Sequence, residues 1–463
     1  MRNYWVKSGA LSLLEKLSVQ LFAFGAVFLL FRALSKESFG TWAIFLTIAA
    51  IIEVARIGLL QNALVKFLST ASKEDYAKIS TASLVLNVLI TAVTISFLWI
   101  IASPAASFFK MPELAILLKI YALTNISLIP FFQMNYIQQA NLDFKGIFWS
   151  NFVRQGLFFS FVLWLFFSHG NISLEDLAYF QIIAALGGSV VAYLFARKFL
   201  RFSKSIDFDW MNRLFQFGIY VFGTNAATQL FKSTDKFLLG RIPIAGPVSV
   251  ALYEAAIKIT NLSDVPTFSM ASILFPQSAR RALEGKTAIK ELYEKAVGAI
   301  LSIMVPIILF VLIFAKQAIL IVAGAQYLDA VPILRITILF GLFMPYAVQF
   351  GTVLDSIGMP RVNFLFTAAS LVVLAIIDYF LIWGFGTIGA AYGTLATYIL
   401  TFVAMQFFLH KKLGVNPLNP ILHIPYFYKT IFKKAISFLK KEPESKVTSS
   451  KTGKPIPVEE PNI

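Results

Sequence analysis

The chain has 463 residues, of which 58% are hydrophobic and 14% are charged, and it contains no cysteine. Soluble domains carry roughly a quarter charged residues, so this composition predicts an integral membrane protein. It excludes a large soluble catalytic domain, a zinc-finger array and a disulfide-stabilised scaffold. A net charge of +16 would suggest nucleic-acid binding in a soluble protein. In a membrane protein it indicates basic cytoplasmic loops, and we expect no nucleic-acid partner.

Twelve windows before residue 412 are apolar and long enough to cross a bilayer as helices, which takes about 20 residues each. They predict an all-α membrane protein of about 12 transmembrane helices. The first window lacks the basic segment and the small-residue cleavage pattern of a signal peptide, so we expect it to be retained. The windows cover residues 10–34, 39–63, 79–102, 114–137, 147–168, 176–198, 214–240, 247–275, 296–315, 331–356, 362–383 and 387–410.

Lysine and arginine residues separate strongly between the two sides that these windows define. The even-numbered loops and both ends of the chain hold 27 of the 40 basic residues. The odd-numbered loops hold only Lys36, Lys110, Arg241 and Lys316. Because basic loops stay in the cytoplasm, the asymmetry supports twelve crossings and predicts a multi-pass protein with both termini cytoplasmic.

The longest polar connection within the predicted bundle lies between spans six and seven. A short basic link at 142–146 has a counterpart at 358–361, an offset that a duplicated six-helix unit would give. Secondary transporters often consist of two such pseudo-symmetric halves around a midplane cavity. We expect an N-terminal six-helix lobe (1–198), a cytoplasmic linker (199–213), a C-terminal six-helix lobe (214–412), a basic amphipathic helix (413–441) and a disordered tail (442–463).

The last two segments differ in composition from the spans. Phe427, Ile431, Ala435 and Phe438 recur at helical spacing, and lysines occupy the opposite face. Such a helix is expected to lie on the cytoplasmic leaflet and bind anionic lipids, with a docking or regulatory role as the alternative. The tail is rich in Pro, Ser, Lys and Glu and has almost nothing to bury.

Nine basic residues lie within the windows or at their ends, where a lipid-facing charge costs roughly 2.5 to 3.5 kcal/mol at mid-span. Arg32, Lys119 and Arg335 are near span ends, so their side chains can reach the interface. Deeper in the spans, acidic and basic residues stand three or four apart on one helical face, which favours pairing. These pairs are Glu53 with Arg56, Lys232 with Asp235, and Glu254 with Lys258.

Each pair has two interpretations: a neutral structural pair, or part of a site. The surplus of positive charge favours a site. Lys236 stands one turn beyond Lys232, and Arg154 has no carboxylate within four residues. Lys16 and Glu15 are adjacent, so they point in directions about 100° apart. An interior with spare cations predicts an anionic ligand.

Enzymatic chemistry has little support in the sequence. His169, His410 and His423 lie in a loop, at a helix end and in the tail, so no histidine is placed within a span as a base. Asp207 and Asp209 form a D-x-D pattern, but it fits the amphipathic start of span seven better than a metal-dependent sugar transferase. Cytoplasmic segments contain no phosphate-binding glycine loop. We expect a transporter with no catalytic residue, metal or tightly bound cofactor.

Several short motifs, taken in order, carry a family resemblance. They are Ser38-Phe39-Gly40, the run from Asp235 to Gly240, the run from Leu252 to Ile259, Leu274-Phe275-Pro276, and Gly324 to Tyr327 followed by Ile333-Leu334-Arg335. Together they resemble the polysaccharide-transporter family, the O-antigen and repeat-unit flippase branch of the multidrug/oligosaccharidyl-lipid/polysaccharide (MOP) flippase superfamily. The resemblance spans roughly residues 8–412.

The resemblance implies two six-helix lobes in a V that alternates between inward-open and outward-open states. It implies transport of an undecaprenyl-pyrophosphate-linked oligosaccharide to the outer leaflet of the inner membrane, and a polysaccharide polymerase and export proteins as partners. Cavity cations would meet the pyrophosphate or acidic sugars, and the matching positions are Arg56, Arg154, Lys232, Lys236 and Lys258. Charge balance, or coupling to an H⁺ or Na⁺ gradient or to the membrane potential, would fall to Glu53, Asp235 and Glu254.

Two rival functions remain open. A multidrug/cation antiporter of the same superfamily would share the helix plan, but it would be expected to use acidic residues for cationic drugs. A membrane glycan polymerase or ligase would normally need a sizeable outer loop for its catalytic residues, and the outer loops here are short. The identity of the glycan does not follow from the sequence.

Overall fold

The computed structural model describes residues 2–168, 172–422, 424–425 and 427–429. These residues form helices and no strand, so the all-α prediction is confirmed. The predicted tail and about half of the predicted basic helix, including residues 430–441, lie outside the described residues. The elements are α1 (Arg2–Ala33), α2 (Lys36–Arg56), η1 (Ile57–Gln61), α3 (Asn62–Ser69), α4 (Lys73–Phe109), α5 (Glu113–Ala140), α6 (Phe144–Phe167), α7 (Leu174–Ala196), η2 (Arg197–Phe199), α8 (Phe208–Arg241), α9 (Pro247–Thr260), η3 (Asn261–Ser263), α10 (Asp264–Arg281), η4 (Ala282–Glu284), α11 (Lys286–Ile313), α12 (Ala315–Val322), η5 (Ala325–Ala330), α13 (Val331–Thr337), α14 (Phe340–Ser356), α15 (Pro360–Phe385) and α16 (Thr387–Leu413).

Most of the expected windows coincide with long apolar helices. Nine described helices are long and apolar enough to cross a membrane, and η5–α13 with α14 makes a tenth span, bent by 51°. The two other windows are also helical, but their apolar runs are interrupted. Lys232, Asp235 and Lys236 lie within α8, and η3 separates α9 from α10. The chain is a multi-pass membrane protein.

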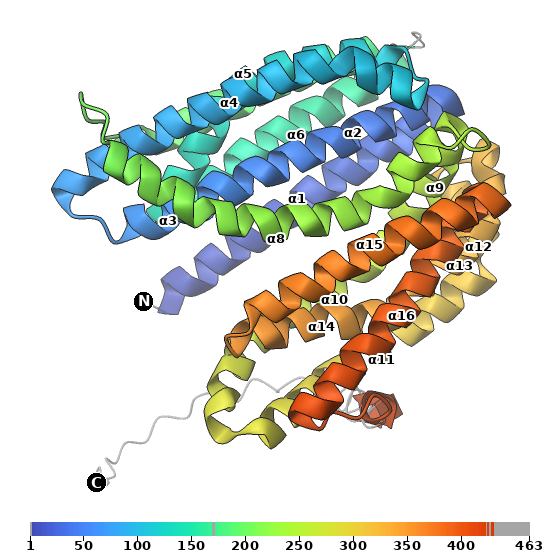
Figure 1. Ribbon diagram of the computed structural model, residues 1–463. Helices are drawn as coiled ribbons and strands as arrows, with labels where there is room; N and C mark the ends of the chain where they lie inside the picture. Colours follow the sequence, from blue (N-terminus) through green and yellow to red (C-terminus); the bar gives the residue numbers. More distant parts are fainter. Residues whose placement is uncertain (1, 169–171, 423, 426, 430–463) are drawn as a thin grey trace, which may run out of the picture.

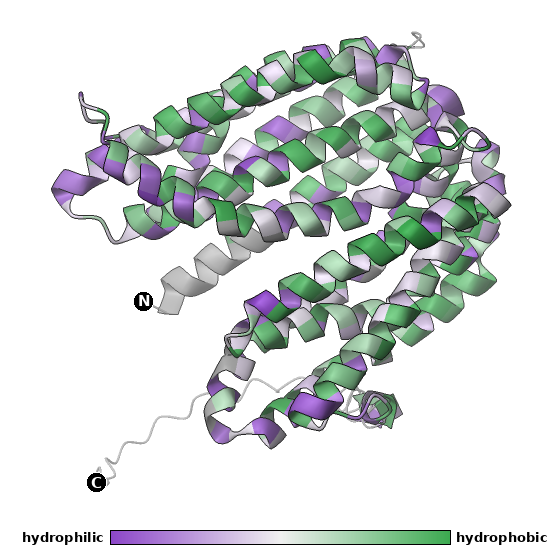
Figure 2. Ribbon diagram, viewed as in Figure 1, coloured by the Kyte–Doolittle hydropathy of each residue, from purple (hydrophilic) through white to green (hydrophobic). Residues whose placement is uncertain are grey.

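The helices form two bundles arranged as a V (Figure 1). We call α1–α7 the first bundle and α9–α16 the second bundle. The bundles meet near α9, α12 and α13, and they diverge toward the opposite end. Apolar residues dominate the helices, and hydrophilic residues gather where helices end, with a few in mid-helix (Figure 2).

Local sequence determines where several helices begin. Ser35, Ser72 and Ser173 each accept a hydrogen bond from the backbone N–H three residues on, as do Asp143 and Asp207. These side chains satisfy backbone donors that a helix start leaves unpaired. Helix α9 starts instead with Pro247, whose fixed φ and missing N–H suit the first helical position.

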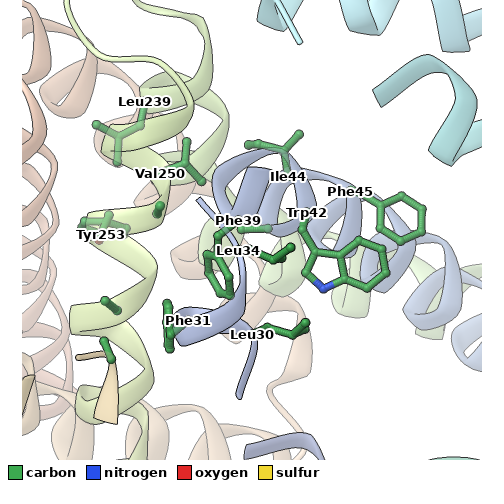
Figure 3. Close-up of a cluster of buried hydrophobic side chains, with 14 of the residues drawn as sticks. Leu30, Phe31, Leu34, Phe39, Trp42, Ile44, Phe45, Leu239, Val250 and Tyr253 are labelled. Atoms are coloured by element: carbon green, nitrogen blue, oxygen red, sulfur yellow. The ribbon is translucent and has the colours of Figure 1, made fainter. Parts of the chain in front are cut away.

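A dry apolar cluster closes the end where the bundles meet. Phe31 and Phe39 stack with ring centroids 4.2 Å apart, and Tyr327 packs against the ring of Phe31. Figure 3 shows this end of α1 and α2 beside Tyr253 and Val250 of α9. A Cβ on Gly40 would lie 1.9 Å from the carbonyl oxygen of Pro247, so α2 and α9 touch backbone to backbone here. Only glycine permits that approach.

Polar contacts hold the same end together. Arg32 donates hydrogen bonds to the carbonyl oxygens of Ile321 (2.5 Å) and Val322 (3.0 Å), at the end of α12. Lys36 forms an ion pair with Asp329 at 3.3 Å. The guanidinium of Arg32, which was expected to be able to reach the lipid interface, thus binds carbonyls left unpaired at the end of α12, where the helix dipole also favours a cation.

Helix α8 contacts both bundles. In its first half, a Cβ on Gly218 would lie 1.9 Å from the carbonyl oxygen of Leu59, which places α8 directly on η1 of the first bundle. In its second half it packs against α15 of the second bundle. The segment after α16 packs against α11. Glu294 of α11 accepts hydrogen bonds from the Asn416 N–H and the Asn419 amide, both at 2.9 Å.

Candidate functional site

Two adjoining sets of charged side chains line cavities on the inner faces of the V. The first cavity, about 280 Å³, lies mainly in the first bundle and is lined by Glu53, Arg154, Gln155 and Gln181. Lys258 reaches it from α9 of the second bundle. The second cavity, about 210 Å³, lies between α8 and the second bundle and is lined by Lys232, Asp235 and Lys236 of α8 and by Asp264 of α10, among others. Both cavities combine charges of the two signs.

Glu53 pairs with a different cation from the one expected. Its Oε1 lies 2.7 Å from Nη2 of Arg154, so the ion pair links α2 to α6. Gly188 of α7 makes room for this arginine, because a Cβ there would lie 2.8 Å from the Cβ of Arg154. The guanidinium also lies 4.9 Å from the ring centroid of Phe131. The pairing of Glu53 with Arg56 is therefore wrong, since Arg154 on the facing helix lies closer.

Arg56 lies away from both cavities. Its side chain is only 1% exposed and turns toward α4 and α5. Its Nη2 donates to Thr91 Oγ1 at 3.1 Å and to Asn125 Oδ1 at 2.7 Å. Because it lines neither cavity, its position supports a structural function in the first bundle.

Glu254 is shared by two lysines. It forms ion pairs with Lys236 (2.9 Å) and with Lys258 (3.2 Å), and its own side chain is almost fully buried. The pair of Glu254 with Lys258 was expected from spacing, but Lys236 as a second partner across helices was not. One carboxylate thus holds two ammonium groups, one lining each cavity.

Lys232 stands at the edge of the second cavity. Among the described residues no carboxylate oxygen lies within 4 Å of its ammonium group, and its Nζ is 5.2 Å from the ring centroid of Phe268. Asp264 lines the same cavity at a greater distance. The expected pairing of Lys232 with Asp235 is wrong, because Asp235 turns toward α9, α15 and α16.

Asp235 belongs to a buried acidic pair. It accepts hydrogen bonds from the Tyr253 hydroxyl and, at 3.1 Å, from Thr394 Oγ1. Asp378 of α15 is fully buried, and it is near enough to Asp235 for the two carboxylates to interact electrostatically. Two buried carboxylates this near to each other cannot both stay charged without a large electrostatic penalty.

Asp378 was not predicted from the sequence, because only acidic residues three or four positions from a basic residue were singled out, and Asp378 has no such neighbour. A signal was present, because a lone carboxylate in the apolar window 362–383 is costly unless it has a function. The hydrogen bonds of Arg32 had no comparable signal. They depend on where α12, almost 300 residues later in the chain, places its last carbonyls.

Comparison with known proteins now adds to this geometry. The model of a family described as "Polysaccharide biosynthesis protein" matches residues 29–332. The chain belongs to the polysaccharide biosynthesis protein family. Among curated relatives of this family member, the probable low-salt glycan biosynthesis flippase Agl15 of Haloferax volcanii is 22% identical over 54% of the chain. The chain spans about half the length of the curated relatives it matches.

Solved structures show which fold this polysaccharide biosynthesis protein has. An inward-facing multidrug resistance MATE family transporter of the MOP superfamily is similar with a TM-score of 0.73, at 15% identity, over 86% of this chain and 94% of that one. The lipid II flippase MurJ, in an inward closed conformation, is also similar, with a TM-score of 0.73 and 12% identity. The match covers 96% of this chain and 94% of that one. The chain therefore has the MOP transporter fold, as the resemblance implied.

Proposed function

We propose that the protein is a flippase that moves a polyprenyl-pyrophosphate-linked oligosaccharide from the inner to the outer leaflet of the cytoplasmic membrane. Family membership and the flippases among its relatives and structural neighbours support this class of substrate. The observation that carries the proposal is the group of three cavity lysines. Lys236 and Lys258 share one carboxylate, and Lys232 has none within 4 Å among the described residues.

The chemistry of the substrate explains why such a group is needed. A pyrophosphate and its sugars lose their hydration on entering hydrocarbon, and this prevents unaided crossing. Ammonium groups facing a cavity replace the lost water around the phosphates. The prenyl tail stays in lipid between the bundles. With the cytoplasm negative, outward movement of the anion is favoured by about 2.3 kcal/mol per charge for each 100 mV.

We assign the open mouth of the V to the cytoplasm, with both termini on that side. The basic even-numbered loops lie at this end, as the positive-inside rule requires for cytoplasmic loops. The end sealed by Phe31, Phe39 and Tyr327 then faces outward. On this assignment the V is an inward-open state, and transport would require the two bundles to rock so that the seal opens and the mouth closes.

We assign coupling to the pair Asp235 and Asp378. Their proximity favours uptake of a proton or a cation such as Na⁺, and Lys236 beside Asp235 connects this pair to the substrate cavity. In proteoliposomes carrying a pH or Na⁺ gradient, Asp378→Asn should abolish the dependence of transport on the effective gradient while substrate binding persists. Glu113→Gln, at the exposed start of α5, is the control. Unchanged gradient dependence in Asp378→Asn would contradict the assignment.

The lysine group is tested by transport of a fluorescent undecaprenyl-pyrophosphate disaccharide in proteoliposomes. The triple variant Lys232→Gln, Lys236→Gln and Lys258→Gln should lose transport, because each hydrogen bond to a charged group contributes about 1.5 to 3 kcal/mol, or tenfold or more. Lys119→Gln, whose lysine lies near Trp99 and outside both cavities, is the matched control. Wild-type rates in the triple variant would overturn the proposal. Export of tetraphenylphosphonium instead of the lipid would favour a cation antiporter.

A further inference from the structure

A third cavity in the second bundle differs in chemistry from the two described above. It has a volume of about 290 Å³, close to the lower end of small-molecule sites. We call it the hydroxyl pocket, because the residues in its wall include Thr352, Thr367, Ser370 and Thr401, which come from α14, α15 and α16. Asp355 and Asn363 are further polar residues of the wall.

The hydroxyl pocket adjoins the second cavity. Phe231, Lys232, Met344 and Tyr398 line both spaces, so Lys232 stands at the junction between them. A ligand whose phosphate meets Lys232 can therefore place its next chemical group in the hydroxyl pocket. In a lipid-linked saccharide, that next group is the sugar attached to the phosphate.

The hydroxyl groups of this pocket are oriented to accept hydrogen bonds. Each donates its own hydrogen to a carbonyl of its own helix, four residues earlier. The donor–acceptor distances are 2.8 Å for Thr352, 3.0 Å for Thr367, 2.7 Å for Ser370 and 2.8 Å for Thr401. A hydroxyl used in this way keeps oxygen lone pairs for a ligand. The pocket thus offers acceptors to a ligand that carries O–H donors.

The remaining wall supplies the carboxylate and the aromatic surface that a sugar ring uses. Asp355 accepts from the Asn363 amide at 3.1 and 3.0 Å and has further acceptor capacity. Phe231, Phe268 and Tyr398 also line the pocket, and Lys232 Nζ lies 5.2 Å from the ring centroid of Phe268. A pyranose has apolar C–H faces and polar edges, so it matches a pocket that combines aromatic rings with hydrogen-bond acceptors.

We propose that the hydroxyl pocket binds the first sugar residue of the lipid-linked saccharide and makes the carrier selective for glycan-bearing lipid over bare polyprenyl pyrophosphate. This inference rests on the proposed flippase function. Lys232 holds the phosphate at the entrance, and the hydroxyl groups and Asp355 hold the sugar behind it.

The test compares binding of two probes to the purified full chain by native mass spectrometry: undecaprenyl pyrophosphate and undecaprenyl-pyrophosphoryl-N-acetylglucosamine. The wild type should prefer the sugar-bearing lipid by at least tenfold. The variant with Thr367→Val, Ser370→Ala and Thr401→Val should lose that preference while binding the bare lipid as before. Thr234→Val is the matched control, because Thr234 also donates to its own helix, at 2.8 Å, but does not line the pocket.

The outcomes separate this inference from the proposed function. If the wild type binds neither lipid, the flippase function fails and the inference fails with it. If both lipids bind and the triple variant keeps the wild-type preference, only the inference is overturned. Loss of tetraphenylphosphonium binding in the triple variant, with lipid preference intact, would identify the pocket as a cation site and also overturn the inference. Thermal stability checks that the triple variant is folded.

Discussion

Arg56 and Lys258 show how differently two basic residues within spans are used. Arg56 is buried among Thr91, Asn125 and Phe132, where its guanidinium fills space in the first bundle. The Lys258 side chain is 33% exposed, shares Glu254 with a second lysine and faces the first cavity. Substitution should therefore affect stability at one position and ligand binding at the other.

Arg56→Ala should lower the free energy of unfolding by at least about 2 kcal/mol, because it leaves a cavity and removes the donor to Asn125. Lys258→Ala should lower it by less than about 1 kcal/mol, since the ammonium group is partly solvated. Thermal denaturation of the purified protein in detergent measures both. Equal stability losses in the two variants would contradict this division between a structural and a ligand-facing residue.

Glu254 provides the counter-charge for Lys236 and Lys258 when no ligand is bound. Glu254→Gln should destabilise the protein, because Lys236 and Lys258 are then left partly buried without a counter-charge. The double variant Glu254→Gln with Lys236→Gln should recover part of the loss, since one of the two uncompensated ammonium groups is removed. A double-mutant cycle on the melting temperature tests this coupling. Additive effects of the two substitutions would argue against it.

At the scale of elements, the close approach of α2 and α9 depends on one missing side chain. A Cβ on Gly40 would meet the backbone of Pro247 at 1.9 Å, and backbone cannot move aside as a flexible side chain can. The contact lies at the sealed end of the V. The seal is therefore specified by a helix pair that packs directly, rather than by a loop.

Gly40→Ala should separate α2 from α9 and lower thermal stability by about 1 to 3 kcal/mol, the usual cost of overpacking. Gly384→Ala in α15 is the matched control, because a Cβ there meets nothing within 4 Å. That substitution should be neutral or slightly stabilising, as alanine favours a helix over glycine. Melting curves of the two variants measure the difference in stability. An unchanged melting temperature in Gly40→Ala would show that α2 and α9 can separate at little cost.

At the scale of the whole molecule, the sealed end combines dry packing with polar contacts that can be removed singly. Arg32 joins α1 to α12, and Lys36 joins the start of α2 to η5. Both contacts link the first bundle to the second. If the bundles rock as proposed, these contacts break when the sealed end opens, so we expect them to favour the proposed inward-open state.

Arg32→Gln should shift the population toward the outward-open state. The chain contains no cysteine, so the buried Ala43, one turn from Gly40, can be replaced by cysteine and labelled without background. A membrane-impermeant maleimide added outside should label Ala43→Cys several-fold faster when Arg32→Gln is also present. Arg335→Gln, which removes an exposed arginine, should leave labelling unchanged. Equal labelling with and without Arg32→Gln would show that Arg32 does not hold the seal.

The sequence predicted the spans well and the partners of charged residues poorly. Hydropathy and loop charge located the helices, because each span must be apolar and long enough to cross the bilayer whichever helices it packs against. Pairing within one helix was right for Glu254 and Lys258, which are four apart. It failed for Glu53 and for Asp235, because Arg154 and Asp378 come from other helices and only packing brings them together.

The attachment of α8 to both bundles has a mechanical consequence. If the bundles rock as proposed, a rigid α8 cannot keep both the contact at Gly218 and the packing on α15, so we expect this helix to bend. Gly223 lies between the two anchor points and has open space where a side chain would be. Glycine is among the residues at which helices bend most readily. A compound that binds beside Gly223 would prevent α8 from bending. It would therefore inhibit transport without competing with the substrate.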